Sequence, residues 1–286
     1  MNFSILYRGP LSSCNYGCDY CPFAKTKNTR AELADDARKL GRFIAWVRQH
    51  PEHTFHVLFT PWGEALIRDY YQRAILELSH LENIRKVAIQ TNLTCSTRWL
   101  EKANKSTVAL WTTYHPTQIS RADFVAKCRE LDALGVQYSV GVVGFKESLD
   151  EIRHLRNELV QDIYLWVNAY KQRDYYYNAV DIDLLQQIDP LFGYNVKRHA
   201  SLGRPCRTGE SVFSLDGDGN MYRCHFIKEK IGNIYEGDFT GNLFPRDCSN
   251  QTCGCHIGYV HMPELKLDEV FGGGELERIP RSYPRR

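Results

Sequence analysis

The chain lacks an excess of charge of either sign. Its 36 basic and 34 acidic residues leave a formal net charge of +2. Proteins that bind nucleic acids or membrane surfaces through electrostatics concentrate positive charge, so the composition supports neither partner. The only basic run lies near the C-terminus, at Arg278, Arg281, Arg285 and Arg286, where we expect a solvated, frayed end.

Long hydrophobic runs are also missing. No stretch approaches the roughly 18 apolar residues of a membrane span, and the N-terminal segment MNFSILYRGP has no basic region followed by the apolar core of a secretory signal. We therefore expect a cytoplasmic protein. Thiols stay reduced in that compartment, so clustered cysteines there more often bind metal or take part in catalysis than form disulfides.

Strand patterns alternate with helical patterns along the first part of the chain. A capping-box pattern, Thr29-x-x-Glu32, precedes the first helix. Such alternation predicts a parallel sheet with helical crossovers. The expected strands cover residues 2–8, 53–59, 87–91, 108–113, 137–143 and 163–169, and the expected helices follow residue 29 and cover 66–81, a short segment near 98, 121–134 and 149–159.

The composition changes near residue 195, where glycine, cysteine and turn signals become more frequent. Residues 209–215 and 221–226 are expected to form a β-hairpin around the turn DGDGN at 216–220. We expect an α/β domain at 1–185 and a small cysteine-rich extension at 195–286, with the boundary between residues 177 and 194.

Three of the ten cysteines lie close together, at Cys14, Cys18 and Cys21. Three thiolates on one loop can bind three irons of a [4Fe–4S] cluster, which usually takes four thiolates. The iron that remains open is then available to a substrate or cofactor. The alternative is a zinc site that borrows a distant fourth ligand, although zinc ligands usually come as two short pairs.

This loop resembles a known signature. Cys14-x3-Cys18-x-Tyr20-Cys21, directly after the first strand, is similar to the CxxxCxφC motif of radical S-adenosylmethionine (SAM) enzymes, and the six strand–helix units resemble the partial (β/α)6 TIM-like barrel of that superfamily. The resemblance implies that SAM binds the open iron and is cleaved after one-electron reduction. A 5′-deoxyadenosyl radical then takes hydrogen from a peptide or small-molecule substrate. An electron donor such as flavodoxin or ferredoxin is implied.

The second strand ends in Thr60-Pro61-Trp62-Gly63-Glu64, which is similar to the family's Gly-Gly-Glu motif. Trp62 stands in the place of the first glycine. The resemblance implies that Gly63 and Glu64 hold the amino group of SAM. A plain turn at the end of the strand is the alternative.

Other strand ends offer further candidates. Asn92 is similar in position to a family asparagine, which implies a contact with the SAM ribose or carboxylate; capping the next helix is the alternative. Ser139 and Gly141 resemble a segment near the adenine, although glycine in a strand also permits close packing. His115 is a candidate substrate contact or a structural histidine. All these residues are expected where parallel barrels place their active sites.

A second group of cysteines lies in the extension. Cys206-x12-Gly219-x4-Cys224 resembles the opening of the SPASM and twitch extensions of radical SAM peptide-modifying enzymes. This implies one auxiliary [4Fe–4S] cluster, with Cys206 and Cys224 joined by two of three later thiols; which two stays open. A structural zinc ribbon is the alternative. The three later thiols are Cys248, Cys253 and Cys255.

The remaining alternatives are a calcium-binding loop and proteins that are not enzymes. A calcium loop at residues 216–227 is excluded, because Met221 and Ile227 replace the required glycine and glutamate. Cys95 and Cys128 stand alone, and we expect them to be buried, unreactive thiols. The alternatives to an enzyme are an Fe–S electron carrier or sensor and a structural zinc protein.

Overall fold

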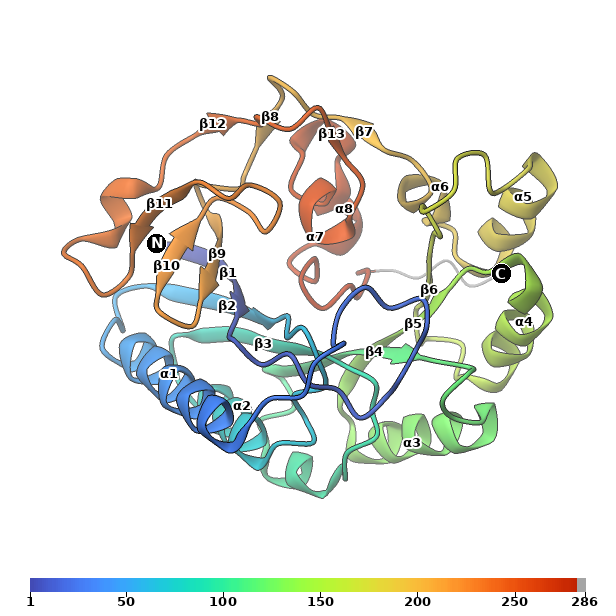
Figure 1. Ribbon diagram of the computed structural model, residues 1–286, viewed down its shortest axis with the longest axis horizontal. Coiled ribbons are helices and arrows are strands. Elements are labelled where there is room, and N and C mark those ends of the chain that lie inside the picture. The colour runs from blue at the N-terminus through green and yellow to red at the C-terminus, as the bar shows by residue number, and fades with distance from the viewer. Residues whose placement is uncertain (282–286) are drawn as a thin grey trace.

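A computed structural model describes residues 1–281 of the chain. A nine-stranded sheet in the order β11-β10-β9-β1-β2-β3-β4-β5-β6 forms its centre and curves through the molecule in Figure 1. From β1 to β6 every neighbouring pair of strands is parallel. The six strands are β1 (Asn2–Arg8), β2 (Thr54–Phe59), β3 (Ile84–Thr91), β4 (Val108–Tyr114), β5 (Gln137–Val143) and β6 (Leu165–Asn168).

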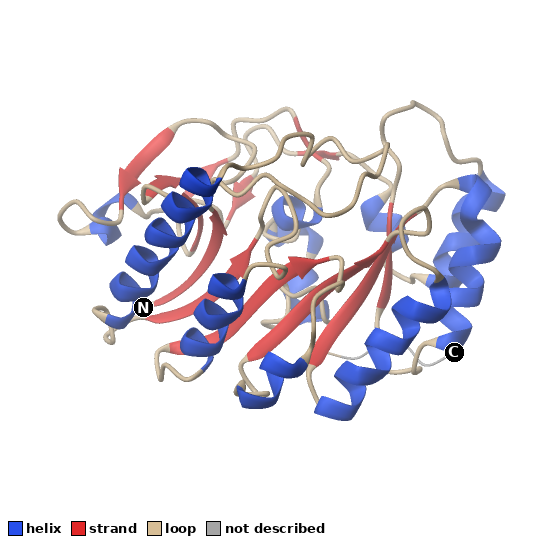
Figure 2. Ribbon diagram, turned by 60° about the horizontal axis from the view of Figure 1, so that its bottom comes forward, coloured by secondary structure: helices blue, strands red, loops and turns tan. Residues whose placement is uncertain are grey.

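Helices connect these strands and cover one face of the sheet, as Figure 2 shows. The arrangement confirms the predicted α/β fold with a partial (β/α)6 TIM-like barrel. Within residues 1–281, no helix has the length and apolar character needed to cross a membrane. The helical segments are α1 (Arg30–Arg48), α2 (Asp69–Ser79), the 3-10 helices η1 (Arg98–Lys102) and η2 (Lys146–Ser148), α3 (Arg121–Leu134), α4 (Leu149–Glu158), α5 (Ala179–Ile188) and α6 (Phe192–Asn195).

Local sequence signals fix where the helices begin and end. The predicted capping box is present, because the Thr29 hydroxyl accepts from the Glu32 amide and the Glu32 carboxylate accepts from the Thr29 amide. Ser120 caps α3, which ends at Gly135 with a φ of 65°, a left-handed conformation that glycine adopts without a Cβ penalty. The loops that carry candidate site residues therefore leave the helices at defined points.

The C-terminal part extends the same sheet. The predicted hairpin is confirmed as β9 and β10, with Gly219 at a φ of 81° in the turn. Strand β9 also pairs in parallel with β1, so the hairpin continues the barrel, and the proposed division into 1–185 and 195–286 stays a prediction. The elements are β7 (His199–Ala200), β8 (Pro205–Cys206), β9 (Val212–Asp216), β10 (Asn220–Tyr222), β11 (Lys230–Asn233), η3 (Phe239–Asn242), β12 (Arg246–Asp247), β13 (Thr252–Cys253), α7 (His256–Tyr259), η4 (Pro263–Leu265) and α8 (Leu267–Phe271).

The two faces of the sheet are buried by different parts of the chain. The outer face packs beneath the helices in one cluster that includes Ile5 and Phe43. The inner face, with Trp111 and Trp166, packs against the C-terminal segment and its residue Leu267. Figure 1 shows α7 and α8 inside the curve of the sheet. The C-terminal segment is therefore part of the core that closes the open barrel.

Replacing a side chain of this inner core tests that conclusion. Leu267 in α8 is 1 % exposed, whereas Leu184 in α5 is 44 % exposed. Leu267→Ala is expected to lower the free energy of unfolding by about 2–5 kcal/mol, because it removes buried methylenes and leaves a cavity. Leu184→Ala is the matched control, with an expected change within about 0.5 kcal/mol. Denaturant unfolding followed by circular dichroism measures both, and equal effects would show that α8 contributes no core packing.

Candidate functional site

A cavity of about 710 Å³ lies at the ends of the parallel strands. Its lining includes residues 61–64 after β2, residues 90–92 at the end of β3, His115 after β4 and Asn168 at the end of β6. The volume falls within the range of about 300–1,000 Å³ that is common for small-molecule sites. The carboxyl ends of the strands are the edge at which parallel barrels carry out their chemistry.

The thiols of Cys14, Cys18 and Cys21 all line this cavity. Burial raises the pKa of the Cys14 and Cys18 thiols, so binding of iron must displace their protons. No three His, Cys, Asp or Glu side chains of residues 1–281 are arranged to hold a single metal ion. A cubane cluster binds each thiolate at a separate iron, and three thiols on one loop facing one cavity provide that kind of donor set.

Side chains from distant elements hold the backbone of the cysteine loop. The Asn28 side-chain oxygen accepts from the amides of Ser12 and Ser13, both at 2.9 Å. The Gln118 side-chain oxygen, beyond β4, accepts from the amide of Gly17 at 2.9 Å. These bonds fix the loop at one point before Cys14 and at a second point between Cys14 and Cys18.

Tyr20 and His115 connect the loop to the end of β4. The Tyr20 hydroxyl lies 2.8 Å from Nδ1 of His115, and the Cys18 sulfur lies 3.6 Å from the same nitrogen. Burial lowers the pKa of His115 to about 4, so the ring is neutral near pH 7. His115 lines the cavity and contacts the cysteine loop, which is a structural role, and its contact with a substrate stays a prediction.

Gly63 lies against the backbone of the cysteine loop. A Cβ at this position would overlap the carbonyl oxygen of Ser13, and the neighbouring Glu64 amide donates to that same oxygen at 3.1 Å. Only glycine allows so close an approach of two backbones. The loop after β2 and the cysteine loop therefore form one continuous wall of the cavity, and the plain-turn alternative does not explain this contact.

The buried Glu64 carboxylate joins the ends of β2 and β3. It accepts from the Thr91 hydroxyl at 2.8 Å, the Asn92 amide at 2.6 Å and the Leu66 amide at 3.0 Å. Burial raises the pKa of Glu64 to about 7, against the lowering effect of these bonds. A carboxylate offers about four acceptor positions, so Glu64, which lines the cavity, retains room for one further donor such as an ammonium group.

Asn92 also lines the cavity and lies beside the first cysteine. Its side-chain nitrogen donates to the Asn15 side-chain oxygen at 3.0 Å and lies 3.9 Å from the Cys14 sulfur. Its side-chain oxygen accepts from the Thr94 amide at 3.1 Å. Asn92 therefore caps the following turn while its amide nitrogen faces the cysteine loop.

Ser139 and Gly141 of β5 are not among the residues that line the cavity. The Ser139 hydroxyl donates to the Glu277 carbonyl at 2.9 Å and accepts from the Trp166 indole at 3.3 Å. A Cβ on Gly141 would overlap the Trp166 ring. Both residues therefore pack the inner core in this structure, as the close-packing alternative describes, and their contact with adenine stays a prediction.

The five C-terminal cysteines influence one another electrostatically. Burial raises the pKa of the Cys224 thiol to about 11, and nearby Cys206 and Cys248 add to the rise. Burial likewise raises the pKa of Cys253 to about 12, with contributions from Cys255, Cys224 and Cys206. Cys255 differs from the other four because it is exposed and lines the large cavity.

The architecture is similar to that of solved structures. No protein-family model and no curated protein matches the chain. The structure of native anSMEcpe with bound AdoMet, which is SAM, superimposes with a TM-score of 0.57 at 14 % identity and covers 84 % of this chain and 80 % of that chain. Its complex with AdoMet and the Kp18Cys peptide gives a TM-score of 0.58 at 13 % identity, covering 85 % and 80 %. The chain has the radical SAM fold.

Within this radical SAM fold, the cavity carries positive side chains that were not among the predicted site residues. Arg8, Lys171 and Arg278 all line it. The expectation of a frayed end at Arg278 is wrong, because that side chain is only 2 % exposed. Arg281 donates to the Gly272 carbonyl, and residues 285 and 286 lie outside the described part of the chain. No local pattern marks Arg278 as buried, since its neighbours come from distant strands.

The charges of these residues meet near Cys255. Cys255 is accessible to solvent through the cavity that it lines, but the protein around it desolvates its thiol and raises the pKa. The positive charges of Lys171, Arg278 and Arg8 oppose that rise. Burial lowers the pKa of Lys171 to about 8 and that of Arg8 to about 10, so both side chains remain mostly protonated near pH 7. This part of the cavity is therefore positively charged.

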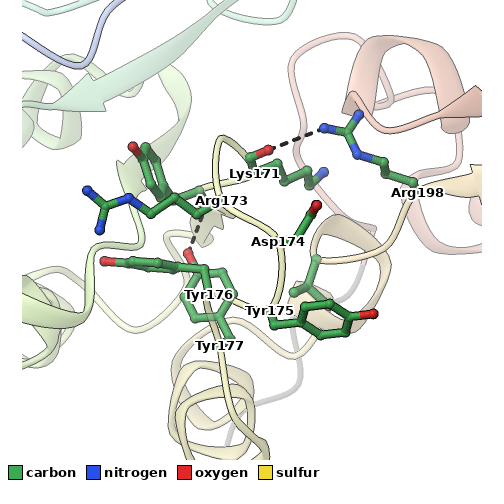
Figure 3. A pocket seen from close by; sticks show the side chains of 9 residues that line it. Lys171, Arg173, Asp174, Tyr175, Tyr176, Tyr177 and Arg198 are labelled. Atoms are coloured by element: carbon green, nitrogen blue, oxygen red, sulfur yellow. Dashed lines mark hydrogen bonds between the residues drawn. The ribbon is translucent and has the colours of Figure 1, made fainter.

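A smaller cavity of about 250 Å³ adjoins the same region. Figure 3 shows it surrounded by the tyrosines that follow β6 and by Lys171 and Arg198. Lys171 lines both cavities, and its backbone carbonyl accepts from Arg198 at 3.3 Å. Tyr175 is fully exposed, whereas the Tyr177 hydroxyl donates to the Gly144 carbonyl. Of the tyrosines around this smaller cavity, only Tyr170 also lines the large one.

Replacing Gly63 tests the contact between the two loops. Gly63→Ala is expected to displace the cysteine loop and to lower the free energy of unfolding by about 1–3 kcal/mol, because the added methyl group overlaps backbone atoms. Denaturant unfolding followed by circular dichroism measures the effect. Gly41→Ala in α1 is the matched control, since a Cβ there meets no atom within 4 Å. An unchanged free energy of unfolding in the Gly63 variant would contradict the structural role assigned to this glycine.

Proposed function

We propose that the chain is a radical SAM enzyme whose SAM-binding [4Fe–4S] cluster is held by Cys14, Cys18 and Cys21. One observation carries this proposal. The three thiols, Glu64 and Asn92 converge on one 710 Å³ cavity at the strand ends of a radical SAM fold. When bound, the cluster and SAM would supply reductive cleavage of SAM and a 5′-deoxyadenosyl radical for hydrogen abstraction.

The chain's own residues position these groups. Glu64 has an acceptor position left for the amino group of SAM, and Gly63 keeps the backbone close to the cysteine loop. Asn92 places its amide nitrogen beside Cys14. Tyr20 and the neutral His115 hold the loop against β4. We propose that together they orient SAM and limit access of water to it.

We further propose an auxiliary [4Fe–4S] cluster held by Cys206, Cys224, Cys248 and Cys253. The mutual influence of Cys206, Cys224, Cys248 and Cys253 supports their proximity. Because Cys255 also acts on Cys253, the choice of Cys248 over Cys255 rests on the pairing of β8 with β12, which brings the segment before Cys248 to Cys206. Four thiolates complete the usual ligand set of such a cluster. Cys255 then faces the large cavity and is not a ligand. The sequence left open which two of Cys248, Cys253 and Cys255 bind the cluster, and this proposal assigns Cys248 and Cys253.

The substrate is proposed to be a peptide or a small molecule, with a flavodoxin or ferredoxin as electron donor. Two of the similar structures hold a bound peptide, described as Cp18Cys and Kp18Cys. Those peptides are properties of that protein, and they make a peptide one candidate here. The residue that receives or donates hydrogen in the reaction is not assigned.

Reductive cleavage of SAM tests the proposed function. Protein reconstituted with iron and sulfide under anaerobic conditions is expected to release 5′-deoxyadenosine from SAM after addition of dithionite, measured by chromatography. Cys18→Ala is expected to abolish this release, since it removes a ligand of the SAM-binding cluster. Cys95→Ala, which removes a buried thiol outside the cavity, is the control and should retain it. Intact protein that forms no 5′-deoxyadenosine would point to an electron carrier or a zinc protein.

Iron content tests the auxiliary set. Two clusters correspond to about eight irons per chain, and loss of one leaves about four. We expect about four for Cys224→Ala, Cys248→Ala and Cys253→Ala, and about eight for Cys255→Ala as the matched control. Iron analysis and Mössbauer spectroscopy measure the result. If the Cys255 variant loses a cluster and the Cys248 variant keeps both, then Cys255, and not Cys248, is a ligand of the auxiliary cluster.

A further inference from the structure

We propose that the large cavity recognises its substrate through an anionic group, a carboxylate or a phosphate, bound by Arg278 and Lys171. The inference rests on the proposed function, because it assigns the substrate class of the same cavity. The support for this anion site is the arrangement of charged side chains in the cavity, and the ligands of the similar structures play no part in it.

Arg278 is a buried cation without a direct ion-pair partner among the described residues. Its side chain lines the cavity and is 2 % exposed. Its guanidinium carbon lies 4.3 Å from the Trp166 ring centroid and 5.7 Å from that of Trp111. Among residues 1–281 it has no hydrogen-bond or ion-pair partner. Burying an arginine is costly unless an anion pairs with it, and its five N–H donors match a carboxylate or phosphate.

The backbone holds Arg278 in this position. Its φ of 56° is in the left-handed region, which a non-glycine residue rarely adopts and which is often found at functional sites. The preceding residue, Glu277, accepts through its carbonyl from the Ser139 hydroxyl at 2.9 Å. This anchor in β5, together with the ring of Trp166, keeps the guanidinium at the cavity before any ligand is present.

Lys171 supplies a second cation from the loop after β6. Its ammonium donates to the Gly254 carbonyl, which leaves two of its three donors available. The charges of Lys171 and Arg278 both act on Cys255, so the two cations lie on the same side of the cavity. They come from segments more than 100 residues apart and meet only in the folded chain.

The carboxylates near the cavity are already engaged. Glu64 is the only acidic residue among the described residues that line it, and three hydrogen bonds tie its oxygens to the ends of β2 and β3. The second carboxylate is that of Asp189, which accepts hydrogen bonds from Tyr164, Val167 and Leu191. Burial raises the pKa of Asp189, and the charge of Arg278 opposes that rise. The charge of Arg278 acts on Asp189, but neither Asp189 nor Glu64 makes a direct ion pair with Arg278 or Lys171 among the described residues. A directly paired anion is therefore expected to arrive with the substrate.

Calorimetric titration of the reconstituted, SAM-loaded protein tests this inference at constant ionic strength. The probes are acetate, inorganic phosphate and acetamide, which resembles acetate in shape but carries no charge. Saturable binding of acetate or phosphate, with acetamide at least about tenfold weaker, is expected from charge-assisted hydrogen bonds. The tighter of the two anions identifies the carboxylate or the phosphate as the substrate group. Equal binding of acetate and acetamide would overturn the inference.

Variants locate the binding site. Arg278→Gln and Lys171→Gln are each expected to weaken anion binding about tenfold or more, and Arg278→Lys should recover part of the loss. Arg173→Gln, at an exposed position that does not line the large cavity, is the matched control with unchanged binding. Circular dichroism establishes that each variant is folded. Because Lys171→Gln changes a half-buried loop residue, it keeps the test decisive if Arg278→Gln does not fold. Full anion affinity in both folded glutamine variants would overturn the inference.

Two further outcomes separate this inference from the proposed function. If anions bind only in the absence of SAM, the cations hold the SAM carboxylate and the inference about substrate is wrong. If anions bind but 5′-deoxyadenosine is never formed, the anion site stands and the proposed reaction fails. Formation of 5′-deoxyadenosine without any saturable anion binding overturns the inference alone.

Discussion

The close contact between Gly63 and the carbonyl of Ser13 is the constraint on which the candidate site depends. It joins the loop after β2 to the cysteine loop without space for a side chain. Glu64 continues the connection to the end of β3 through Thr91 and Asn92. A loop of about 20 residues has a large conformational entropy, and these fixed contacts explain how three separate thiols face one cavity.

The C-terminal segment serves the barrel in two ways. Its helices fill the inner face of the sheet, where an open barrel would otherwise expose Trp111 and Trp166. It also brings Cys255 and Arg278 to the cavity that the N-terminal cysteines line. The proposed auxiliary ligands and one of the two proposed substrate contacts, Arg278, therefore lie on one stretch of chain, so folding of the extension and completion of the cavity are coupled.

Sequence patterns predicted those features that depend on residues close together in the chain. The spacing of Cys14, Cys18 and Cys21, the Thr29 cap and the six strand–helix units are local signals, and the fold followed from them. The burial of Arg278 depends on the rings of Trp111 and Trp166, in strands more than 100 residues away. Gly141 illustrates the same limit of local patterns. A side chain at position 141 would overlap the Trp166 ring, and no spacing of residues near position 141 reveals that contact.

The near-neutral composition conceals an uneven distribution of charge around the large cavity. Glu64, after β2, is the only acidic residue among the described residues that line it, whereas Arg278 and Lys171 line it from the C-terminal segment and the loop after β6, with Arg8 and Lys25 as further cations. In a low-dielectric cavity, fixed charges orient a ligand before chemistry begins. An ammonium group is favoured beside Glu64 and an anion beside Arg278. The same distribution of charge would hold SAM and an anionic substrate in different parts of one cavity and leave their reacting portions facing each other.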